Sequence, residues 1–192
     1  LYGGSNQAVT PEDIDAVLSH FAPGDYLLMQ NELSNFTYLL RAAVGRGLRV
    51  VLNASPISEE VLAADLTGVD WLVVNEIECA AIAGCSTPEE GYAALRARYP
   101  GLGILLTLGS EGSVSWKDGT EVRQCAYPVK AVDTTGAGDT FMGYFVGCLA
   151  QGMERQTAMQ YASMASAISV TRPGAAASIP LMDEVRAAVE AL

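Results

Sequence analysis

The stretch "DTTGAGDTF", residues 133–141, places two acids, three threonine hydroxyls and two glycines before a long apolar run. A glycine-rich turn that opens a helix presents unpaired backbone N–H groups and the positive end of the helix dipole, and both attract anions. The carboxylate of Asp139 lies inside this turn, where it could take a proton from a hydroxyl that attacks a phosphoryl group. An ordinary capped turn, in which Asp139 only caps the helix, is the alternative.

Two common nucleotide-binding patterns are absent around this turn. A Rossmann fingerprint, G-x-G-x-x-G, would need a glycine where the chain has Phe141. A P-loop is excluded as well, because the sequence contains no G-x-x-x-x-G-K-[ST] segment. What remains is a helix N-terminus at which Gly136 and Gly138 allow the backbone to approach an anion closely, with Asp139 beside it.

Alternating strands and helices are predicted to position this turn. Short apolar, β-rich runs that each precede a helical pattern occupy residues 26–30, 48–55, 71–75 and 103–109. This alternation is typical of a parallel sheet with crossover helices. Two helices, at 10–18 and 86–95, begin with threonine before proline and with acids in the first turn, which predicts capped, well-defined starts.

The pattern changes after residue 109. Apolar and polar residues alternate on either side of "KDG" at 117–119, which predicts an antiparallel hairpin at the edge of the sheet. Two long helices are then predicted over about 136–152 and 155–171, and a short helix over 181–191. The glycine-rich turn therefore opens the first of these helices.

The composition predicts one folded domain over residues 1–192. Half of the residues are hydrophobic (50%) and only 17% are charged, which excludes a disordered chain. The best candidate for a membrane span, residues 141–150, falls far short of the roughly 20 apolar residues that a span requires. We therefore expect no membrane partner.

The charge and the cysteine content exclude further classes of partner and site. The formal net charge is −11 with only two lysines, which argues against a nucleic-acid partner, although a small anion could bind at a local positive spot. The cysteines form no C-x-x-C pair, so neither a zinc site nor a disulfide framework is indicated. We expect buried thiols in a reducing cytoplasm. The four cysteines are Cys79, Cys85, Cys125 and Cys148.

The seven positions D-T-x-G-A-G-D resemble the second signature of the ribokinase family of carbohydrate kinases, the phosphofructokinase-B type. The resemblance implies a ribokinase-like three-layer αβα fold, with a mainly parallel sheet and ligand sites at the carboxyl ends of its strands. It also implies ATP-dependent phosphorylation of a sugar hydroxyl, in which Asp139 accepts the hydroxyl proton and nearby backbone N–H groups hold the developing charge. The matching residues are Asp133, Thr134, Gly136, Ala137, Gly138 and Asp139.

Two more stretches resemble nucleotide-binding parts of this family. The helix in "YASMASAIS" (161–169) is similar to one that borders adenine, and it carries Ser163 where family members often have His or Asn. Close packing of small residues against a neighbouring helix would explain the same run. The segment "LLTLGSEG" (105–112) is similar to a turn that binds ATP. It implies nucleotide contacts by Thr107, Leu108, Gly109, Ser110, Glu111 and Gly112.

The resemblance implies two cation sites. Asn75 and Glu78 match an N-x-x-E motif that organises Mg²⁺ and its waters around the nucleotide phosphates, and Mg²⁺ prefers one or two carboxylates with water and phosphate oxygens. A solvated helix start is the alternative for this pair. A K⁺ site near the anion-binding turn is also implied. Its residues would be Asp133, Thr135, Ser169, Arg172, Gly174 and Ser178.

The sugar acceptor is indicated by one short segment. "MQNEL" (29–33) resembles a strand end whose acid contacts the sugar in members that act on ribose, which aligns with Glu32; a plain surface acid is the alternative. The resemblance thus favours conversion of D-ribose to ribose 5-phosphate. Fructose, fructose 6-phosphate, adenosine and 2-keto-3-deoxygluconate stay open as acceptors.

The resemblance covers the whole chain but only the C-terminal two-thirds of a typical family member. The N-terminal strands, the β lid and most sugar contacts are missing, so we expect little or no sugar kinase activity from the chain itself. We also expect homo-oligomers or larger assemblies, because a truncated sheet exposes an unpaired edge. A nucleotide-binding module without catalysis is the second hypothesis, since it would share every nucleotide motif.

Overall fold

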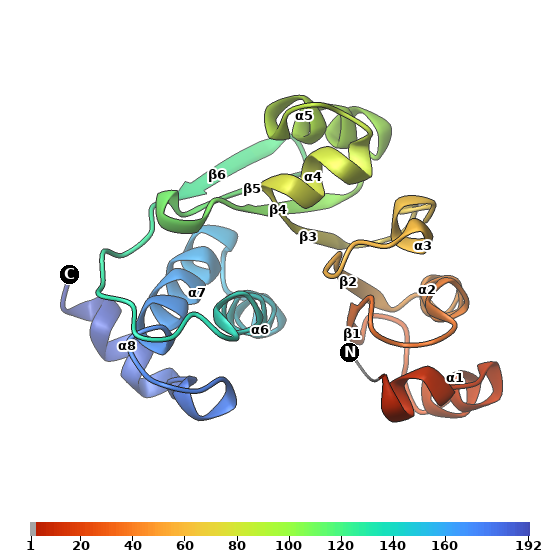
Figure 1. Ribbon diagram of the computed structural model, residues 1–192, viewed down its shortest axis with the longest axis horizontal. Helices are drawn as coiled ribbons and strands as arrows, with labels where there is room; N and C mark the ends of the chain where they lie inside the picture. Colours follow the sequence, from red (N-terminus) through yellow and green to blue (C-terminus); the bar gives the residue numbers. More distant parts are fainter. Residues whose placement is uncertain (1–2) are drawn as a thin grey trace. The chain divides into compact units, whose positions relative to one another are not determined.

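The computed structural model describes residues 3–192 (Figure 1). The chain forms two compact units. The first comprises Leu1–Leu106 with Trp116–Thr120, and the second comprises Thr107–Ser115 with Glu121–Leu192.

One six-stranded sheet has the strand order β1-β2-β3-β4-β5-β6. The pairs β1–β2 and β2–β3 are parallel, with Leu28 opposite Val51 and Leu52 opposite Leu72. The four predicted strand segments are confirmed to within about two residues at their ends. The strands are β1 (Tyr26–Gln30), β2 (Arg49–Asn53), β3 (Trp71–Asn75), β4 (Gly103–Thr107), β5 (Ser113–Lys117) and β6 (Thr120–Gln124).

The predicted hairpin consists of β5 and β6, and β6 is an edge strand. Only Asp118 and Gly119 join the two strands, which is too short for a parallel crossover, so they run antiparallel. Both turn residues have positive φ, 51° and 79°, which is the conformation that favours Asp-Gly in two-residue hairpins.

The first unit carries helices α1 to α5, and the two capped starts predicted from the sequence are confirmed. Thr10 and Asp13 form a reciprocal capping box at α1, and the Thr87 side chain accepts from the N–H of Glu90 at α5, as predicted. Helix α1 packs on α2, α2 on β2, and α4 on both β3 and α5. The helices are α1 (Pro11–Leu18), α2 (Phe36–Gly45), α3 (Glu59–Leu62), α4 (Glu76–Ala83) and α5 (Pro88–Arg98), after a 3₁₀ turn η1 (Gly4–Ala8).

The core of this unit fixes where the strands begin and end. Val50, Leu52 and Leu72 are fully buried on adjacent strands. At Gly103 an added Cβ would lie 2.6 Å from the ring of Trp71, so only glycine lets the start of β4 approach the start of β3 this closely. Apolar packing therefore joins β2 to β3, and the close approach at Gly103 joins β4 to β3.

The second unit is built around α6 (Ala137–Ala150), α7 (Arg155–Ser169) and α8 (Met182–Glu190), which agree with the predicted helices. Helix α6 packs on α7, and α7 on α8 (Figure 1). Met164, Ala165 and Val185 form a buried cluster between α7 and α8. Two 3₁₀ turns, η2 (Gly109–Glu111) and η3 (Ala176–Ser178), complete the unit.

The cysteines differ from the sequence expectation in part. All four are free, and Cys79 and Cys148 are buried, with burial raising the pKa of the Cys79 thiol to about 11. The prediction of buried thiols is wrong for Cys125, which is exposed because it lies just beyond the edge strand β6; Cys85 is half-buried. Within residues 3–192, no helix is long and apolar enough to cross a membrane.

Candidate functional site

The predicted anion-binding turn opens helix α6. Gly136 is its N-cap and has a left-handed backbone (φ 75°, ψ 9°), a conformation that favours glycine. Its carbonyl accepts the first helical hydrogen bond from Thr140 N at 2.8 Å. The N–H groups at the start of a helix lack acceptors within the helix, so the backbone of this first turn can provide donors for an anion. One of them, Ala137 N, donates to the Thr134 carbonyl at 3.2 Å.

The loop before α6 is tied to the loop after α7 through Asp133. Its Oδ1 accepts from Thr135 N at 2.9 Å, and its Oδ2 accepts from Gly174 N at 3.0 Å. Hydrogen bonds from the Thr135 side chain, and then from the backbone of Thr135 and Gly174, lower the pKa of the Asp133 carboxyl. The carbonyl of Val170 also accepts from Val132 N and Asp133 N, at 2.7 and 3.2 Å. The turn is thus held from outside before any ligand binds.

A cavity of about 710 Å³ lies in this unit, a volume that suits a small organic ligand. Several residues predicted to bind nucleotide or phosphate line it. They are Thr107, Gly109, Ser110, Gly112, Ala137, Gly138 and Ser163. The rest of the lining is mostly apolar, and the fold has brought these three predicted segments together around one space.

The nucleotide turn between β4 and β5 depends on its glycines. Gly112 has φ 103°, and an added Cβ would lie 2.0 Å from the carbonyl oxygen of Gln124, so no larger residue fits there. Leu108 N donates to Gly112 O at 2.8 Å and closes the turn. Leu108 and Glu111 belong to the turn but do not line the cavity.

Asp139 lies in the first turn of α6, is exposed and follows the cavity-lining Gly138. The next residue, Thr140, is 3% exposed, and its hydroxyl has no hydrogen-bond partner within the described part of the chain. Sequence reasoning missed Tyr127 and Ser166, which also line the cavity. Ser166 donates to the Ala137 carbonyl at 3.2 Å and lies in the segment 161–169 that resembles an adenine-bordering helix, which could have marked it, whereas Tyr127 belongs to no recognisable motif.

Asn75 and Glu78 form a reciprocal capping box at α4 in the first unit. Asn75 Oδ1 accepts from Glu78 N, and Glu78 Oε2 accepts from Asn75 N, both at 2.9 Å. Glu78 is only 8% exposed, which a plain solvated helix start does not explain. Each oxygen keeps a further lone pair, so the pair fits the preference of Mg²⁺ for oxygen ligands and bound waters.

Ser55, which no motif indicated, links the end of β2 to the residue after β1 and to the first turn of α4. Its hydroxyl hydrogen-bonds Glu78 Oε1, its carbonyl accepts from Asn31 N at 3.2 Å, and its N–H donates to Asn53 Oδ1 at 3.2 Å. Glu32, the predicted sugar contact, is exposed and directly follows Asn31. The Glu32 carbonyl accepts from the Gln7 side chain at 3.2 Å. The polar network therefore reaches from Glu78 to the segment of Glu32.

The residues implied for K⁺ lie around the tie made by Asp133. The Ser169 carbonyl accepts from Arg172 N at 3.1 Å, and Arg172 forms an ion pair with Glu184. The Ser178 hydroxyl donates to the Ala175 carbonyl at 2.7 Å. No group of three or more His, Cys, Asp or Glu side chains that could hold a metal occurs in residues 3–192. A cation here would therefore depend on carbonyl and hydroxyl oxygens beside Asp133.

The sequence matches the pfkB family of carbohydrate kinases over residues 1–182, so the chain belongs to that family. The predicted family is confirmed. The ribokinase of Staphylococcus aureus is 33% identical over 195 residues, which cover 96% of this chain and 63% of the relative. The deoxyribokinase of Salmonella typhi is 31% identical over 189 residues, covering 94% of this chain and 61% of the relative. The chain spans less than two thirds of the length of these relatives.

A solved structure confirms the predicted ribokinase-like α/β fold class. Arabidopsis thaliana ribokinase, complexed with ribose and ATP, has a TM-score of 0.81 and is 25% identical. The match covers 98% of this chain and 64% of that one.

Proposed function

We propose that this chain is the nucleotide-binding part of a kinase that transfers the γ-phosphoryl group of ATP to a hydroxyl of D-ribose, giving ribose 5-phosphate and ADP. The single observation that carries the proposal is the start of α6, where backbone donors, left-handed Gly136 and the carboxylate of Asp139 follow one another beside the 710 Å³ cavity. Membership of a family of carbohydrate kinases supports the reaction class.

In this proposal each part of the α6 turn has one task. The sugar hydroxyl loses its proton to Asp139 as its oxygen bonds to the γ-phosphorus, and the bond from phosphorus to the ADP oxygen breaks. The N–H groups of Gly136, Ala137, Gly138 and Asp139 stabilise the charge on the transferred group. Because Asp133 already fixes the turn, little reorganisation is needed when substrates bind.

The proposed nucleotide contacts are the turn at 107–112 and Ser163 on α7. Thr107, Gly109, Ser110 and Ser163 line one cavity with Gly138, which supports a single nucleotide spanning them. The solved relative that carries ATP supports the choice of nucleotide. Leu108 and Glu111 would act by closing the turn rather than by lining the cavity.

Two cations belong to the proposal. Mg²⁺, held through its waters by Asn75 and Glu78, would neutralise phosphate charge when bound. K⁺ would be held by oxygens of Asp133, Thr135, Ser169, Arg172, Gly174 and Ser178 and would steady the loop before α6. The direct ties from Asp133 to Thr135 and Gly174 support this grouping.

The choice of sugar rests on Glu32 and on the relatives. Similar proteins are a ribokinase and a deoxyribokinase, so 2-deoxyribose is the first competitor of D-ribose. We place the protein in the cytoplasm, where ATP is abundant and free thiols persist, consistent with four free cysteines. We also propose self-association through the edge strand β1, on which Leu28 is 40% exposed.

Isothermal titration of this chain with ATP, followed by a coupled ADP-release assay of the full-length protein with no sugar, D-ribose, 2-deoxyribose or fructose, tests this function. ATP binding with sugar-stimulated ADP release would support the kinase, and the best sugar would name the acceptor. ATP binding without stimulation would favour the non-catalytic nucleotide-binding module. A chain that binds no ATP would overturn both.

A further inference from the structure

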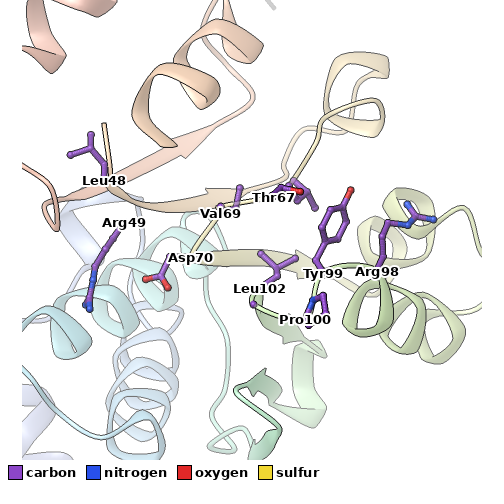
Figure 2. Close-up of a pocket in the computed structure, with 12 residues that line it drawn as sticks. Leu48, Arg49, Thr67, Val69, Asp70, Arg98, Tyr99, Pro100 and Leu102 are labelled. Atoms are coloured by element: carbon purple, nitrogen blue, oxygen red, sulfur yellow. The ribbon is translucent and has the colours of Figure 1, made fainter. Parts of the chain in front are cut away.

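A second cavity, of about 420 Å³, lies in the first unit at the amino ends of β2, β3 and β4 (Figure 2). It is opposite the strand ends that carry Asn53 and Asn75, and none of the predicted site residues lines it. Its floor is apolar, since Leu48, Leu66 and Leu102 are buried. Its charged lining consists of Arg49, Asp70 and Arg98.

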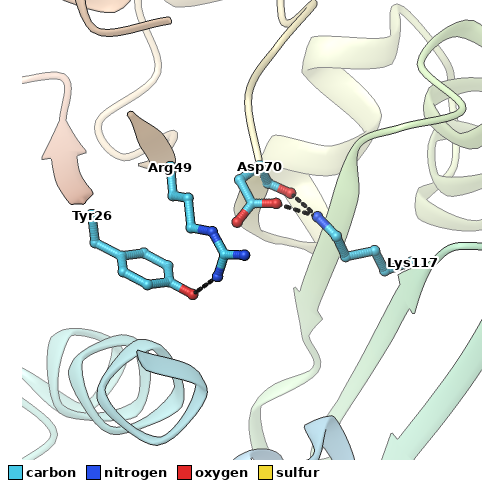
Figure 3. Close-up of polar contacts among 4 residues, drawn as sticks. All are labelled: Tyr26, Arg49, Asp70 and Lys117. Atoms are coloured by element: carbon cyan, nitrogen blue, oxygen red, sulfur yellow. Dashed lines mark hydrogen bonds and ion pairs between the residues drawn. The ribbon is translucent and has the colours of Figure 1, made fainter. Parts of the chain in front are cut away.

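Arg49 presents a charged group with spare donors at this edge. One guanidinium nitrogen donates to the Tyr26 hydroxyl at 2.7 Å, and the guanidinium lies 5.3 Å from the centre of the Tyr26 ring (Figure 3). A guanidinium has five N–H donors, and Arg49 is exposed, so several remain for a ligand. The hydrogen bond with Tyr26 raises the pKa of Arg49, and its charge is permanent.

Asp70 is neutralised from the side away from Arg49. Its Oδ1 is bound by the Lys117 ammonium, which also donates to the Asp70 carbonyl at 2.9 Å. In Figure 3 the carboxylate of Asp70 faces the guanidinium of Arg49, but in the described part of the chain the two form no direct ion pair. Asp70 Oδ2 is therefore available as an acceptor next to a cation.

The charge balance of the cavity lining is opposite to that of the chain. Two arginines, Arg49 and Arg98, line the cavity with one carboxylate, Asp70, which is itself paired with Lys117, whereas the whole chain carries a net charge of −11. A local cationic group in an acidic protein favours a small anion, and a polyanion would be repelled by the rest of the surface.

We propose that this amino-edge cavity binds a small organic anion, a phosphomonoester or carboxylate that bears a hydroxyl beside its charged group. The anion contacts Arg49, the hydroxyl donates to Asp70 Oδ2, and the carbon frame lies against Leu102 and Tyr99. The proposal does not depend on the kinase function, because no residue of the proposed catalytic or nucleotide site takes part.

Amide NMR of the 192-residue chain with glycerol 3-phosphate tests this site. We expect saturable shifts of the Gly68 and Gly101 amide signals, which report on the cavity. Glycerol should cause none, and propyl phosphate, which lacks the hydroxyls, should bind several-fold more weakly. Shifts confined to Gly109 and Gly138, or no saturable shift, would overturn the site, and equal binding of propyl phosphate would overturn the contact to Asp70.

Substitutions localise the anion contact. Arg49→Gln should weaken binding roughly tenfold, as expected for loss of a charged hydrogen bond, and Arg98→Gln should weaken it less. Arg46→Gln is the matched control, because Arg46 pairs with Asp15 at 3.6 Å and does not line the cavity. The spectrum of Arg49→Gln away from the cavity should be unchanged, which shows that the chain is folded. If this folded variant binds glycerol 3-phosphate as tightly as the parent, the proposal is contradicted.

Discussion

The loop before α6 and the strand-end network around Glu78 create polar sites by different means. The loop uses backbone: a left-handed Gly136, N–H donors and the ties from Asp133 to two further amides. The network uses side chains, because buried Glu78 is bound by Asn75 from its own motif and by Ser55 from the loop after β2. A site built from backbone requires glycines at fixed spacing, which can be recognised in the sequence. A site built from side chains depends on which strands become neighbours in the fold.

The largest expected effect is on turnover, and it comes from replacing the proposed base, Asp139, at the start of α6. In the full-length enzyme, Asp139→Asn should lower sugar-stimulated ADP release by about 10²- to 10⁴-fold, because a positioned base is lost, while ATP affinity by titration changes little. Asp183→Asn, in the first turn of α8, is the matched control. Near-parental turnover of Asp139→Asn would refute its role as the base.

Removing the Ser55 hydroxyl tests the network. Ser55→Ala leaves an oxygen of buried Glu78 without its partner, so the free energy of unfolding should fall by about 1–3 kcal/mol in urea titrations. The Mg²⁺ dependence of ATP binding should weaken as well, and Ser55→Thr should restore both. The control Ser19→Ala removes an exposed hydroxyl that bonds a helix carbonyl. Unchanged Mg²⁺ dependence in Ser55→Ala would limit Ser55 to a structural role.

Substitution by alanine at Gly136 and at Gly138, which flank the start of α6, should change the free energy of unfolding in opposite directions. Gly136→Ala puts a Cβ on a left-handed residue and should cost about 1–2 kcal/mol of unfolding free energy, although the nearest atom would be 3.6 Å away. Gly138→Ala lies inside the helix in open space and should raise stability by up to about 1 kcal/mol, yet weaken ATP binding because Gly138 lines the cavity. If Gly136→Ala and Gly138→Ala change the free energy of unfolding equally, the left-handed conformation of Gly136 does not determine the structure of this turn.

The smallest effect is the acid dependence of the tie made by Asp133. The pKa of this carboxyl is lowered in the folded chain, so its contribution to stability is present at neutral pH and is lost as the pH falls below about 4. Urea midpoints between pH 3 and 7 should therefore depend less on pH in Asp133→Asn than in the parent. Asp118→Asn, in the exposed β5–β6 turn, serves as the control. If the urea midpoint depends on pH equally in the parent and in both variants, the hydrogen bonds of Asp133 do not contribute to stability.

Much of the fold could be predicted because its signals are local. The Thr-Pro starts of α1 and α5, the Asp-Gly turn of the hairpin and the apolar runs of β1 to β4 each record a backbone requirement of their own segment. The exposure of Cys125 was not predictable in this way, since its position beyond the edge strand depends on the strand order of the whole sheet.

The sequence by itself determined the family, the glycine-rich turn that opens α6 and the acid inside it, because glycine spacing and helix starts are properties of consecutive residues. Only the tertiary structure decided that Ser55 binds Glu78, that Tyr127 and Ser166 share a cavity with Gly138, and that Arg49 faces Asp70. These contacts join residues far apart in the chain, and their formation depends on strand order and packing, which no short segment specifies.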